Sequence, residues 1–345
     1  MRTFQQIEKI RKIPTATSWY LADLGEARGK QELFTKQSPQ KLRVLREHAL
    51  IESAVSSNRI EGVTVDRKRV ATVVFGHAHL RDRSEEEVRC YRNALEWIHR
   101  DGARIPLSEK TVLALHRISR GEVWDAGKYK AKNVDIIERL SGGRSRVRFK
   151  TVDASSAPAS MRRLVEAWQE ALKERHVPPL IALAAWNLDF LCIHPFRDGN
   201  GRVSRLLLLL QSYALGYDVG RYISLERLIE DNKARYYETL ERSSQGWHEG
   251  KHDPWPYVNY LLYILKTAYQ EFECRVGQMK SPRGAKSALI RSTINEYAEA
   301  FTVADLERAC PGVSREMIRH VLRDLQQSKQ VECLGRGPGA RWKKR

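Results

Sequence analysis

Residues 194–205 read His-Pro-Phe-Arg-Asp-Gly-Asn-Gly-Arg-Val-Ser-Arg and combine side chains suited to proton transfer and anion binding. His194 is the residue of this segment that can exchange a proton near neutral pH. Gly199, Asn200 and Gly201 bring backbone amides to the start of the next predicted helix, where unpaired N–H groups and the helix dipole attract an anion. The spacing therefore predicts a site for a phosphate-containing ligand.

Two arginines and one aspartate extend this predicted anion site. Arg202 and Arg205 are three residues apart, so they lie on one face of a helix and can bind phosphate oxygens through their planar guanidinium groups. Asp198 is suited to bind Mg²⁺ that accompanies the phosphates. A base beside a metal-bound phosphate indicates phosphoryl or nucleotidyl transfer.

Apolar sequence on both sides must hold this segment in place. Residues 180–193 have apolar side chains at steps of three and four, which predicts a helix that Pro195 ends. Residues 203–217 include five consecutive leucines, so this helix is apolar on every side and is predicted to be buried. Phe196 is expected to anchor the segment in the core. The segment is thus predicted to connect two core helices, and we name it the 194–205 loop.

The 194–205 loop resembles the signature of the Fic family, His-Pro-Phe-x-(Asp/Glu)-Gly-Asn-Gly-Arg-x-x-Arg, at every specified position. The resemblance implies a mainly α-helical protein adenylyltransferase, which moves AMP from ATP to a Ser, Thr or Tyr hydroxyl of a target protein or of itself. It implies His194 as the base, Asp198 as the Mg²⁺ ligand, and Arg202 and Arg205 as phosphate ligands. The other nucleotide-binding positions that it implies are Gly199, Asn200 and Gly201.

A carboxylate at the end of an upstream helix would need a cationic partner. Residues 40–62 read as an amphipathic helix that closes near Gly62, with Ser57 and Glu61 one turn apart on the same face. A helix dipole repels a carboxylate at this end, and the alternative is a solvated glutamate. Ser57-x-x-x-Glu61-Gly62 resembles the inhibitory motif of the Fic class whose inhibitory helix precedes the catalytic domain. The resemblance implies that Glu61 pairs with Arg205 and so keeps this guanidinium from the γ-phosphate of ATP.

A β-hairpin is predicted between the two helical parts of the core. Residues 133–138 and 146–152 are rich in β-forming side chains and flank Ser141-Gly142-Gly143. The hairpin occupies the place of the Fic flap, here residues 130–152, which aligns a target by strand addition. Lys130 stands where the family often has Arg.

Two other helices carry residues of interest. Ser84 and Glu87 form the pattern of a capping box at the start of a predicted helix. Residues 224–243 are predicted to form a helix that carries Tyr236 and Tyr237. The Fic resemblance implies that these tyrosines line an adenine pocket, and the alternative is packing in the core.

The last residues, 281–345, are predicted to form a separate module after the linker Ser281-Pro282-Arg283-Gly284. A helix, a helix-turn-helix and a terminal hairpin resemble a winged-helix domain. Its clustered cations are Arg315, Arg319 and Arg323 on one helix and Arg336, Arg341, Lys343, Lys344 and Arg345 near the end. This layout suits phosphate contacts with duplex DNA, and the alternative is a winged helix that binds protein.

The expected architecture is mainly α in three parts: an N-terminal helical region (1–80), a catalytic core (81–280) and the module 281–345. A formal net charge of +18 over 345 residues favours an anionic partner such as nucleic acid, acidic protein or nucleotide. Five cysteines without Cys-x-x-Cys spacing indicate neither a zinc site nor a disulfide framework. We expect a cytoplasmic protein without a membrane span or a signal peptide.

The sequence leaves other functions open. One is a nonenzymatic DNA-binding regulator whose Fic core senses nucleotides, against which the intact His194 argues. Another is a Fic enzyme that transfers a different group, such as UMP, phosphate or phosphocholine, or that removes AMP. A homo-oligomer is also open, and nothing in the sequence specifies the target protein or a DNA sequence.

Overall fold

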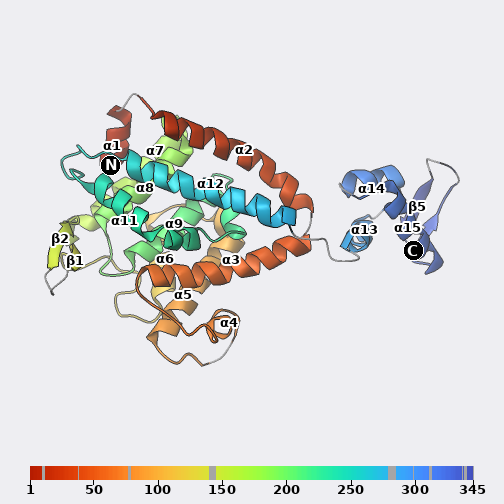
Figure 1. Ribbon diagram of the computed structural model, residues 1–345, viewed down its shortest axis with the longest axis horizontal. Coiled ribbons are helices and arrows are strands. Elements are labelled where there is room, and N and C mark those ends of the chain that lie inside the picture. Colours follow the sequence, from red (N-terminus) through yellow and green to blue (C-terminus); the bar gives the residue numbers. More distant parts are fainter. Residues whose placement is uncertain are drawn as a thin grey trace. The chain divides into compact units, whose positions relative to one another are not determined.

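Helices make up most of the described chain, and two small antiparallel sheets accompany them (Figure 1). The computed structural model describes residues 1–9, 12–37, 39–76, 79–139, 145–278, 285–297, 299–310, 313–335, 337 and 340–344. The chain divides into two units, residues 1–31 with 44–273 and residues 32–43 with 274–345. The expected mainly α class is confirmed. Division at residues 80 and 280 stays a prediction, and linker residues 281–284 lie outside the described residues.

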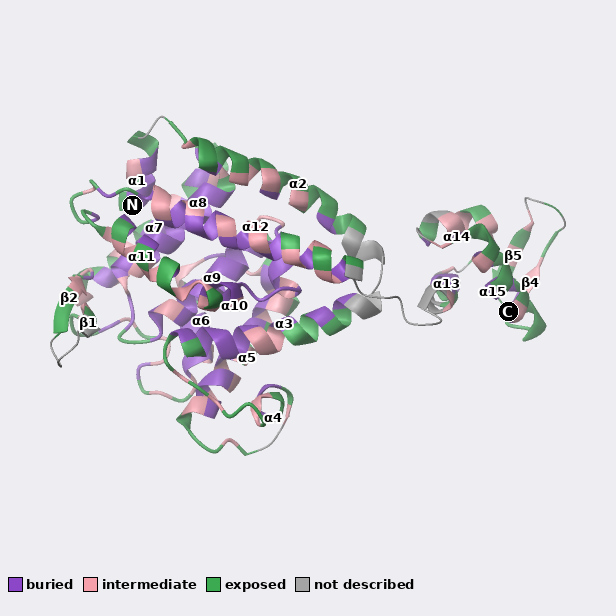
Figure 2. Ribbon diagram, in the orientation of Figure 1, coloured by how far each residue is buried: buried purple, intermediate pink, exposed green. Residues whose placement is uncertain are grey.

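Two buried helices form the centre of the first unit (Figure 2). Every residue of α8 (Pro179–Ile193) is buried except Pro179 and Leu191. In α9 (Asn200–Ala214), the five leucines at 206–210 are each at most 2% exposed. Burial of this much apolar side chain contributes roughly 1.5–3 kcal/mol per leucine. The prediction of two core helices joined by the 194–205 loop is confirmed.

The structure describes further α-helices up to residue 278. They are α1 (Arg2–Lys9), α2 (Thr15–Gln37), α3 (Pro39–Ile60), α4 (Val70–Phe75), α5 (Arg83–Asp101), α6 (Glu109–Arg120), α7 (Ala157–Glu174), α10 (Leu225–Asp231), α11 (Lys233–Ser244) and α12 (Trp255–Gln278). Helices α5 and α6 pack on each other and on α9, whereas α1 and α7 pack on α8. Helices α5 and α6 thus lie together against the start of α9.

Two sequence predictions about these helices are wrong. Helix α5 begins with Asp82 as its N-cap, whose side chain accepts a hydrogen bond from the backbone N–H of Glu85. Ser84 and Glu87 therefore form no capping box, and Glu87 is available for other contacts. The helix expected over residues 224–243 is two helices, α10 and α11, which meet at Asn232.

The predicted hairpin is present in its described part. Strand β1 (Ile136–Arg139) pairs antiparallel with β2 (Ser145–Phe149), and Ile137 lies opposite Val147. Its expected turn, residues 141–143, lies outside the described residues.

The second unit has three helices and one sheet among its described residues after 284. The helices are α13 (Ala285–Glu296), α14 (Val303–Ala309) and α15 (Arg315–Gln327), and the strands are β3 (Phe301–Thr302), β4 (Val331–Cys333) and β5 (Arg341–Lys344), in the order β3-β5-β4. Ser314 caps α15 by accepting a hydrogen bond from the backbone of Met317. Fully buried Phe301, Leu306 and Leu322 lie in its core. The winged-helix assignment stays a prediction.

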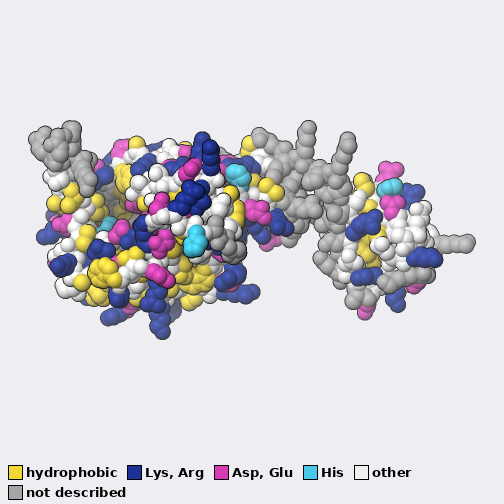
Figure 3. Space-filling model, turned by 90° about the horizontal axis from the view of Figure 1, so that it is seen from below, with side chains coloured by type: hydrophobic (Ala, Val, Ile, Leu, Met, Phe, Trp, Pro, Cys, Tyr) yellow, Lys and Arg dark blue, Asp and Glu magenta, His cyan; other side chains and the backbone are white. Residues whose placement is uncertain are grey.

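Charged side chains cover both units. On the face shown in Figure 3, Lys and Arg side chains are spread over each unit, with Asp and Glu side chains among them. In the described part of the chain, no helix has both the length and the apolar composition that crossing a bilayer requires.

Candidate active site

The 194–205 loop is held in shape by its own backbone and by Asn200. His194 ends α8 with φ 53° and Gly199 precedes α9 with φ 82°, a left-handed conformation that glycine adopts without strain. The side chain of Asn200 accepts a hydrogen bond from the N–H of Phe196 (3.0 Å) and donates one to its carbonyl (2.8 Å). Asn200, the first residue of α9, therefore closes the loop.

His116 of α6 fastens the loop from outside, a role that sequence reasoning missed. Its ring stacks on Phe196 with 3.8 Å between ring centroids. Nδ1 accepts a hydrogen bond from the backbone of Gly127 (2.9 Å), so Nε2 carries the hydrogen and donates it to the carbonyl of Asp198 (3.1 Å). Burial lowers the pKa of His116 to about 4, which keeps the ring in the neutral form that this pattern requires.

His194 lies at the edge of a pocket and is neutral at physiological pH. Burial, followed by the positive charge of Lys130, lowers the pKa of His194 to about 4. Nδ1 lies 3.4 Å from the carbonyl of Leu191, and with its hydrogen directed there Nε2 keeps the lone pair that a general base needs. Lys130 is held beside it, because its ammonium donates to the carbonyl of Ile193 (3.3 Å).

The structure brings Glu61 and Arg205 into contact. Nη2 of Arg205 donates to the carboxylate of Glu61 (2.8 Å) and to the carbonyl of Ser57 (2.9 Å), and Nε donates to the Ser57 hydroxyl (2.8 Å). The same Glu61 carboxylate covers Gly201, because a Cβ added there would lie 2.3 Å from its Oε1. Gly62 follows in a left-handed turn (φ 85°). We name residues 57–62 the inhibitory turn after the resemblance; an inhibitory effect stays a prediction.

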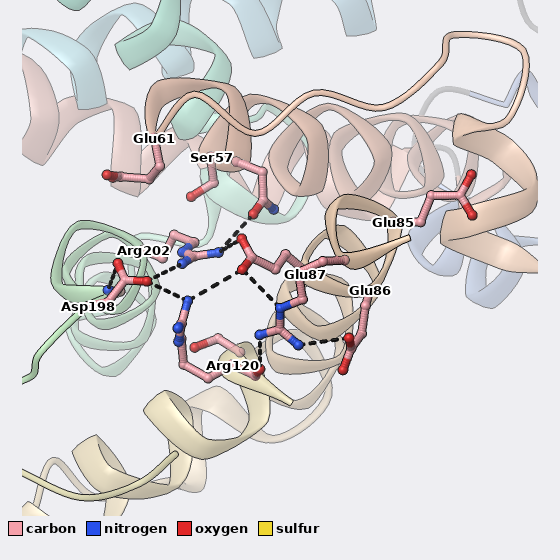
Figure 4. A network of polar contacts seen from close by, with 12 residues as sticks. Ser57, Glu61, Glu85, Glu86, Glu87, Arg120, Asp198 and Arg202 are labelled. Carbon is pink, nitrogen blue, oxygen red and sulfur yellow. Dashed lines mark hydrogen bonds and ion pairs between the residues drawn. The ribbon is translucent and has the colours of Figure 1, made fainter. Parts of the chain in front are cut away.

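Arg202 is engaged in a buried network (Figure 4). Its side chain is 3% exposed, and Nη1 donates to Glu87 of α5 (2.6 Å) and to the Asn58 side chain (3.3 Å). The role of phosphate ligand that the resemblance implies for Arg202 stays a prediction.

Asp198 is the exposed end of that network. Its side chain is 58% exposed, and Oδ2 pairs with Arg120 of α6 at 2.8 Å and with Arg202 at 3.8 Å. Oδ1 accepts a hydrogen bond from the backbone of Gly199 (2.6 Å). Glu87 and Arg120 were missed as site residues, since only the packing of α5 and α6 on α9 brings them here.

The metal that the site could hold depends on the exposed carboxylate of Asp198. Across the described residues, no group of three or more His, Cys, Asp or Glu side chains could hold a metal ion. Mg²⁺ takes one or two carboxylates and fills its remaining positions with phosphate oxygens and water. Asp198 therefore fits Mg²⁺ that arrives on a nucleotide and does not fit a site built from protein ligands alone.

A pocket of about 480 Å³ opens beside His194 and Gly201, within the size range of small-molecule sites. Its apolar wall comes from the hairpin, α8 and α11. Tyr237 lies in this wall, where the Arg148 guanidinium is 5.7 Å from its ring centroid and donates to its carbonyl (2.8 Å). Tyr236 also lines the pocket but is only 3% exposed and packs against Tyr260. Tyr237 suits contact with a ligand, and Tyr236 chiefly supports it.

Known proteins resemble this chain over the region that contains the 194–205 loop. The family model of the Fic/DOC family matches residues 106–212, which contain α6, α8 and the 194–205 loop. A solved Fic family protein from Desulfovibrio desulfuricans G20 is 25% identical, covers 97% of each chain and has a TM-score of 0.62. A Fic domain containing signaling protein from Bacteroides thetaiotaomicron VPI-5482 is 21% identical over 75% of this chain and 99% of its own, with a TM-score of 0.62, which supports the fold.

Curated relatives match part of the chain. The protein adenylyltransferase Fic of Drosophila erecta is 26% identical over 225 residues, which are 57% of this chain and 39% of that protein. A Fido domain-containing protein of Dictyostelium discoideum is 42% identical over 66 residues, 16% of this chain and 43% of its own. The chain thus spans about two fifths of the length of the relatives it matches.

Proposed function

We propose that this chain is a protein adenylyltransferase, which moves AMP from ATP to a Ser, Thr or Tyr hydroxyl of a target protein or of itself. The observation that carries the proposal is a neutral His194 at the rim of the same pocket onto which the start of α9 opens at Gly201. A general base and an anion-binding helix N-terminus are the two parts that nucleotidyl transfer needs. The name of the Drosophila relative, which is an adenylyltransferase, supports the same reaction.

In the proposed reaction, Nε2 of His194 removes the proton of the acceptor hydroxyl. The hydroxyl oxygen forms a bond to the α-phosphorus of ATP while the bond from that phosphorus to pyrophosphate breaks, so pyrophosphate leaves. The backbone amides at Gly199, Asn200 and Gly201 hold phosphate oxygens. Mg²⁺ carried by ATP would neutralise charge that develops on pyrophosphate, and Asp198 would hold it.

The pocket walls suit a nucleoside. Phe149, Tyr237 and Leu240 provide flat and apolar surface for a base, and the pocket opens toward the α9 N-terminus, where the phosphates would lie. The Arg148 contacts hold β2 against α11. The hairpin therefore closes one side of the pocket and presents its outer edge to a target chain.

Autoinhibition belongs to the same proposal. The Glu61 carboxylate holds Arg205 and covers Gly201, so it lies where a terminal phosphate of ATP would meet the helix N-terminus. Two anions at one position repel each other, so ATP would bind with its α-phosphorus out of line for attack. Movement of the inhibitory turn would release Arg205 for the γ-phosphate.

Intact-mass spectrometry tests the transferred group directly. The Glu61→Gly protein is incubated with Mg²⁺ and ATP, and separately with UTP or CDP-choline, and its mass is measured. We expect a gain of one AMP with ATP alone, absent in Glu61→Gly/His194→Ala. A gain of UMP, phosphate or phosphocholine would replace AMP as the transferred group. No gain with ATP and a candidate target would contradict the proposal.

A second function is favoured by the surface of α15. We infer that the second unit is a winged helix that binds duplex DNA. Ile318, Val321 and Leu325 bury one face of α15, whereas Arg319 and Arg323 are exposed on another. Exposed arginines on a helix backed by a packed core suit the phosphates beside a DNA groove.

Salt dependence tests this second function in the full chain. We expect affinity for duplex DNA to fall steeply as salt rises, because bound counterions are released from the DNA. Arg319→Gln with Arg323→Gln should weaken binding and flatten that slope by about 2. Equal affinity of the variant and the unmodified chain, or no binding at low salt, would favour a protein-binding role for the unit.

A further inference from the structure

Three consecutive glutamates at the start of α5 meet three different surroundings. Glu85 pairs with Arg69 (2.8 Å to Nη2) on the side away from the 194–205 loop. Glu86 pairs with Arg83 (2.7 Å) near the surface. Glu87 points toward the loop, where Arg120 and Arg202 surround it, whereas Glu85 points away from them (Figure 4).

Glu87 binds guanidinium groups from three elements. Its Oε2 accepts a hydrogen bond from Arg202 of α9 (2.6 Å), while Oε1 accepts from Arg83 of α5 (3.2 Å) and Arg120 of α6 (3.5 Å). The carboxylate is 12% exposed, and Arg120 and Arg202 are 6% and 3% exposed. Glu87 thus places one negative charge between two buried cations.

These two arginines both reach the same oxygen of Asp198. Arg120 is 2.8 Å and Arg202 is 3.8 Å from Oδ2 of Asp198. Two buried guanidinium groups this close repel each other unless a carboxylate lies between them. Loss of the Glu87 charge would therefore separate Arg120 from Arg202 and weaken the contacts that hold Oδ2 of Asp198.

We propose that Glu87 is a positioning residue for nucleotide binding: it binds Arg120 and Arg202 together and thereby fixes the carboxylate of Asp198 at the 194–205 loop. Glu87 itself contacts neither the pocket nor His194, so it acts through the two arginines. The inference deepens the proposed function and rests on it for the identity of the nucleotide. It assigns Glu87 and Arg120, which lie outside the 194–205 loop, to the same working unit as Asp198.

Glu85 offers a matched control for the test. Glu87→Gln and Glu85→Gln each remove one buried carboxylate charge from α5 and keep a side chain of the same shape. Both are made in the Glu61→Gly chain, so that transfer is measurable. The readouts are the Kd of ATP by calorimetry with and without Mg²⁺, the KM and kcat of AMP transfer, and the Tm.

We expect Glu87→Gln to raise the Kd and KM of ATP in Mg²⁺ about tenfold, as losing a partner that orients a ligand-binding group does. The effect on Kd without Mg²⁺ should be smaller, and kcat should change less than about threefold, because the base remains in place. Glu85→Gln should lower the Tm by a similar amount and leave Kd and KM unchanged. Equal Kd and KM in the two variants would overturn the proposal.

Arg120→Lys keeps the test decisive if Glu87→Gln does not fold. Nη1 of Arg120 makes both the Glu87 and the Asp198 contact, and a lysine side chain is one bond too short to bring its ammonium to that position, so a comparable rise in Kd is expected. An unchanged Kd in folded Arg120→Lys would contradict the proposal. A changed Kd in a chain that transfers no AMP would refute the proposed function alone.

Discussion

Arg202 and Arg205 lie one turn apart on the same helix, and both are buried, yet carboxylates of two different kinds hold them. Glu61 follows the end of α3, and its side chain is 32% exposed where it meets Arg205. Glu87 belongs to the body of α5, and its side chain is 12% exposed where it meets Arg202. Glu61 lies on a partly exposed turn, whereas Glu87 lies among the three packed helices α5, α6 and α9.

This difference predicts different free energies of opening for the two contacts. A carboxylate at a partly solvated turn regains water when it leaves its partner, so opening the Glu61–Arg205 pair costs less than opening a pair in which both partners are buried. A carboxylate removed from a buried pair leaves an uncompensated charge, which costs roughly 3–5 kcal/mol. The Glu61–Arg205 pair is therefore suited to act as a switch, and the Glu87–Arg202 pair is suited to be permanent.

The largest effect is expected from loss of the general base, which leaves the Glu61–Arg205 and Glu87–Arg202 pairs intact. His194→Ala should lower AMP transfer by about 10²–10⁴-fold, because the base that accepts the hydroxyl proton is lost. The Kd of ATP should stay nearly constant, since the imidazole contacts the acceptor and not the phosphates. Radiolabelled-ATP transfer and calorimetry on the Glu61→Gly background measure the two quantities. Near-normal turnover would mean that another group is the base.

The next largest effect is expected from removal of the Glu61–Arg205 pair. Glu61→Gly should raise self-modification about tenfold or more, because a gate of a few kcal/mol keeps the active arrangement rare. Arg205→Ala should lower transfer even in that background, since the γ-phosphate then has no guanidinium to bind. The two substitutions should be non-additive, as groups in direct contact are. If the double variant matched Glu61→Gly, Arg205 would not be the contested residue.

The two arginine sites also differ in how far the sequence predicts them. Spacing alone places Ser57 and Glu61 on one helix face, and their meeting with Arg205 was expected from the resemblance to the Fic inhibitory motif. Glu87 could not be expected at the site, because its local sequence suggests a capping box that Asp82 replaces.

Contacts between helices distant in sequence explain the rest of what was missed. Arg120 and His116 reach the 194–205 loop only because α6 packs on α9, a contact between residues about 80 positions apart. The local sequence pattern does not predict which partner a buried charge contacts. It does predict the core helices, because buried apolar side chains recur along the sequence at helical spacing.

A smaller effect should come from the anchor of the inhibitory turn. The ammonium of Lys233 in α11 donates to the carbonyl of Ile60 (2.8 Å), at the end of α3. Lys233→Met removes one hydrogen bond from the closed state, worth roughly 1 kcal/mol, and should raise self-modification about threefold to fivefold. Lys173→Met, at an exposed position of α7, should leave it unchanged. A loss of the effect in the Glu61→Gly background would place Lys233 in the same switch, whereas equal activity of the two lysine variants would contradict the anchor.

The smallest expected effect separates the two carboxylates by their influence on His194. Burial first, then the charge of Lys130, lower the pKa of this imidazole to about 4, and the charge of Glu61 raises it by a smaller amount, whereas Glu87 pairs with Arg120 and Arg202. The neutral ring is the base, so protonation of His194 should leave kcat/KM unchanged from pH 8 to 6. It should lower kcat/KM only as the pH approaches about 4. Glu61→Gly should move that fall in kcat/KM to slightly lower pH, and Glu87→Gln should leave it in place.

The same pKa shift makes the stability of the fold depend on pH. The folded-state pKa of His194 lies below the unfolded value of about 6.5, so the unfolded chain binds the extra proton and stability falls as pH drops from 6.5 toward 4. Near-ultraviolet circular dichroism must therefore accompany each point of the pH profile, and a limb centred near pH 6.5 in the folded protein would contradict the burial of His194.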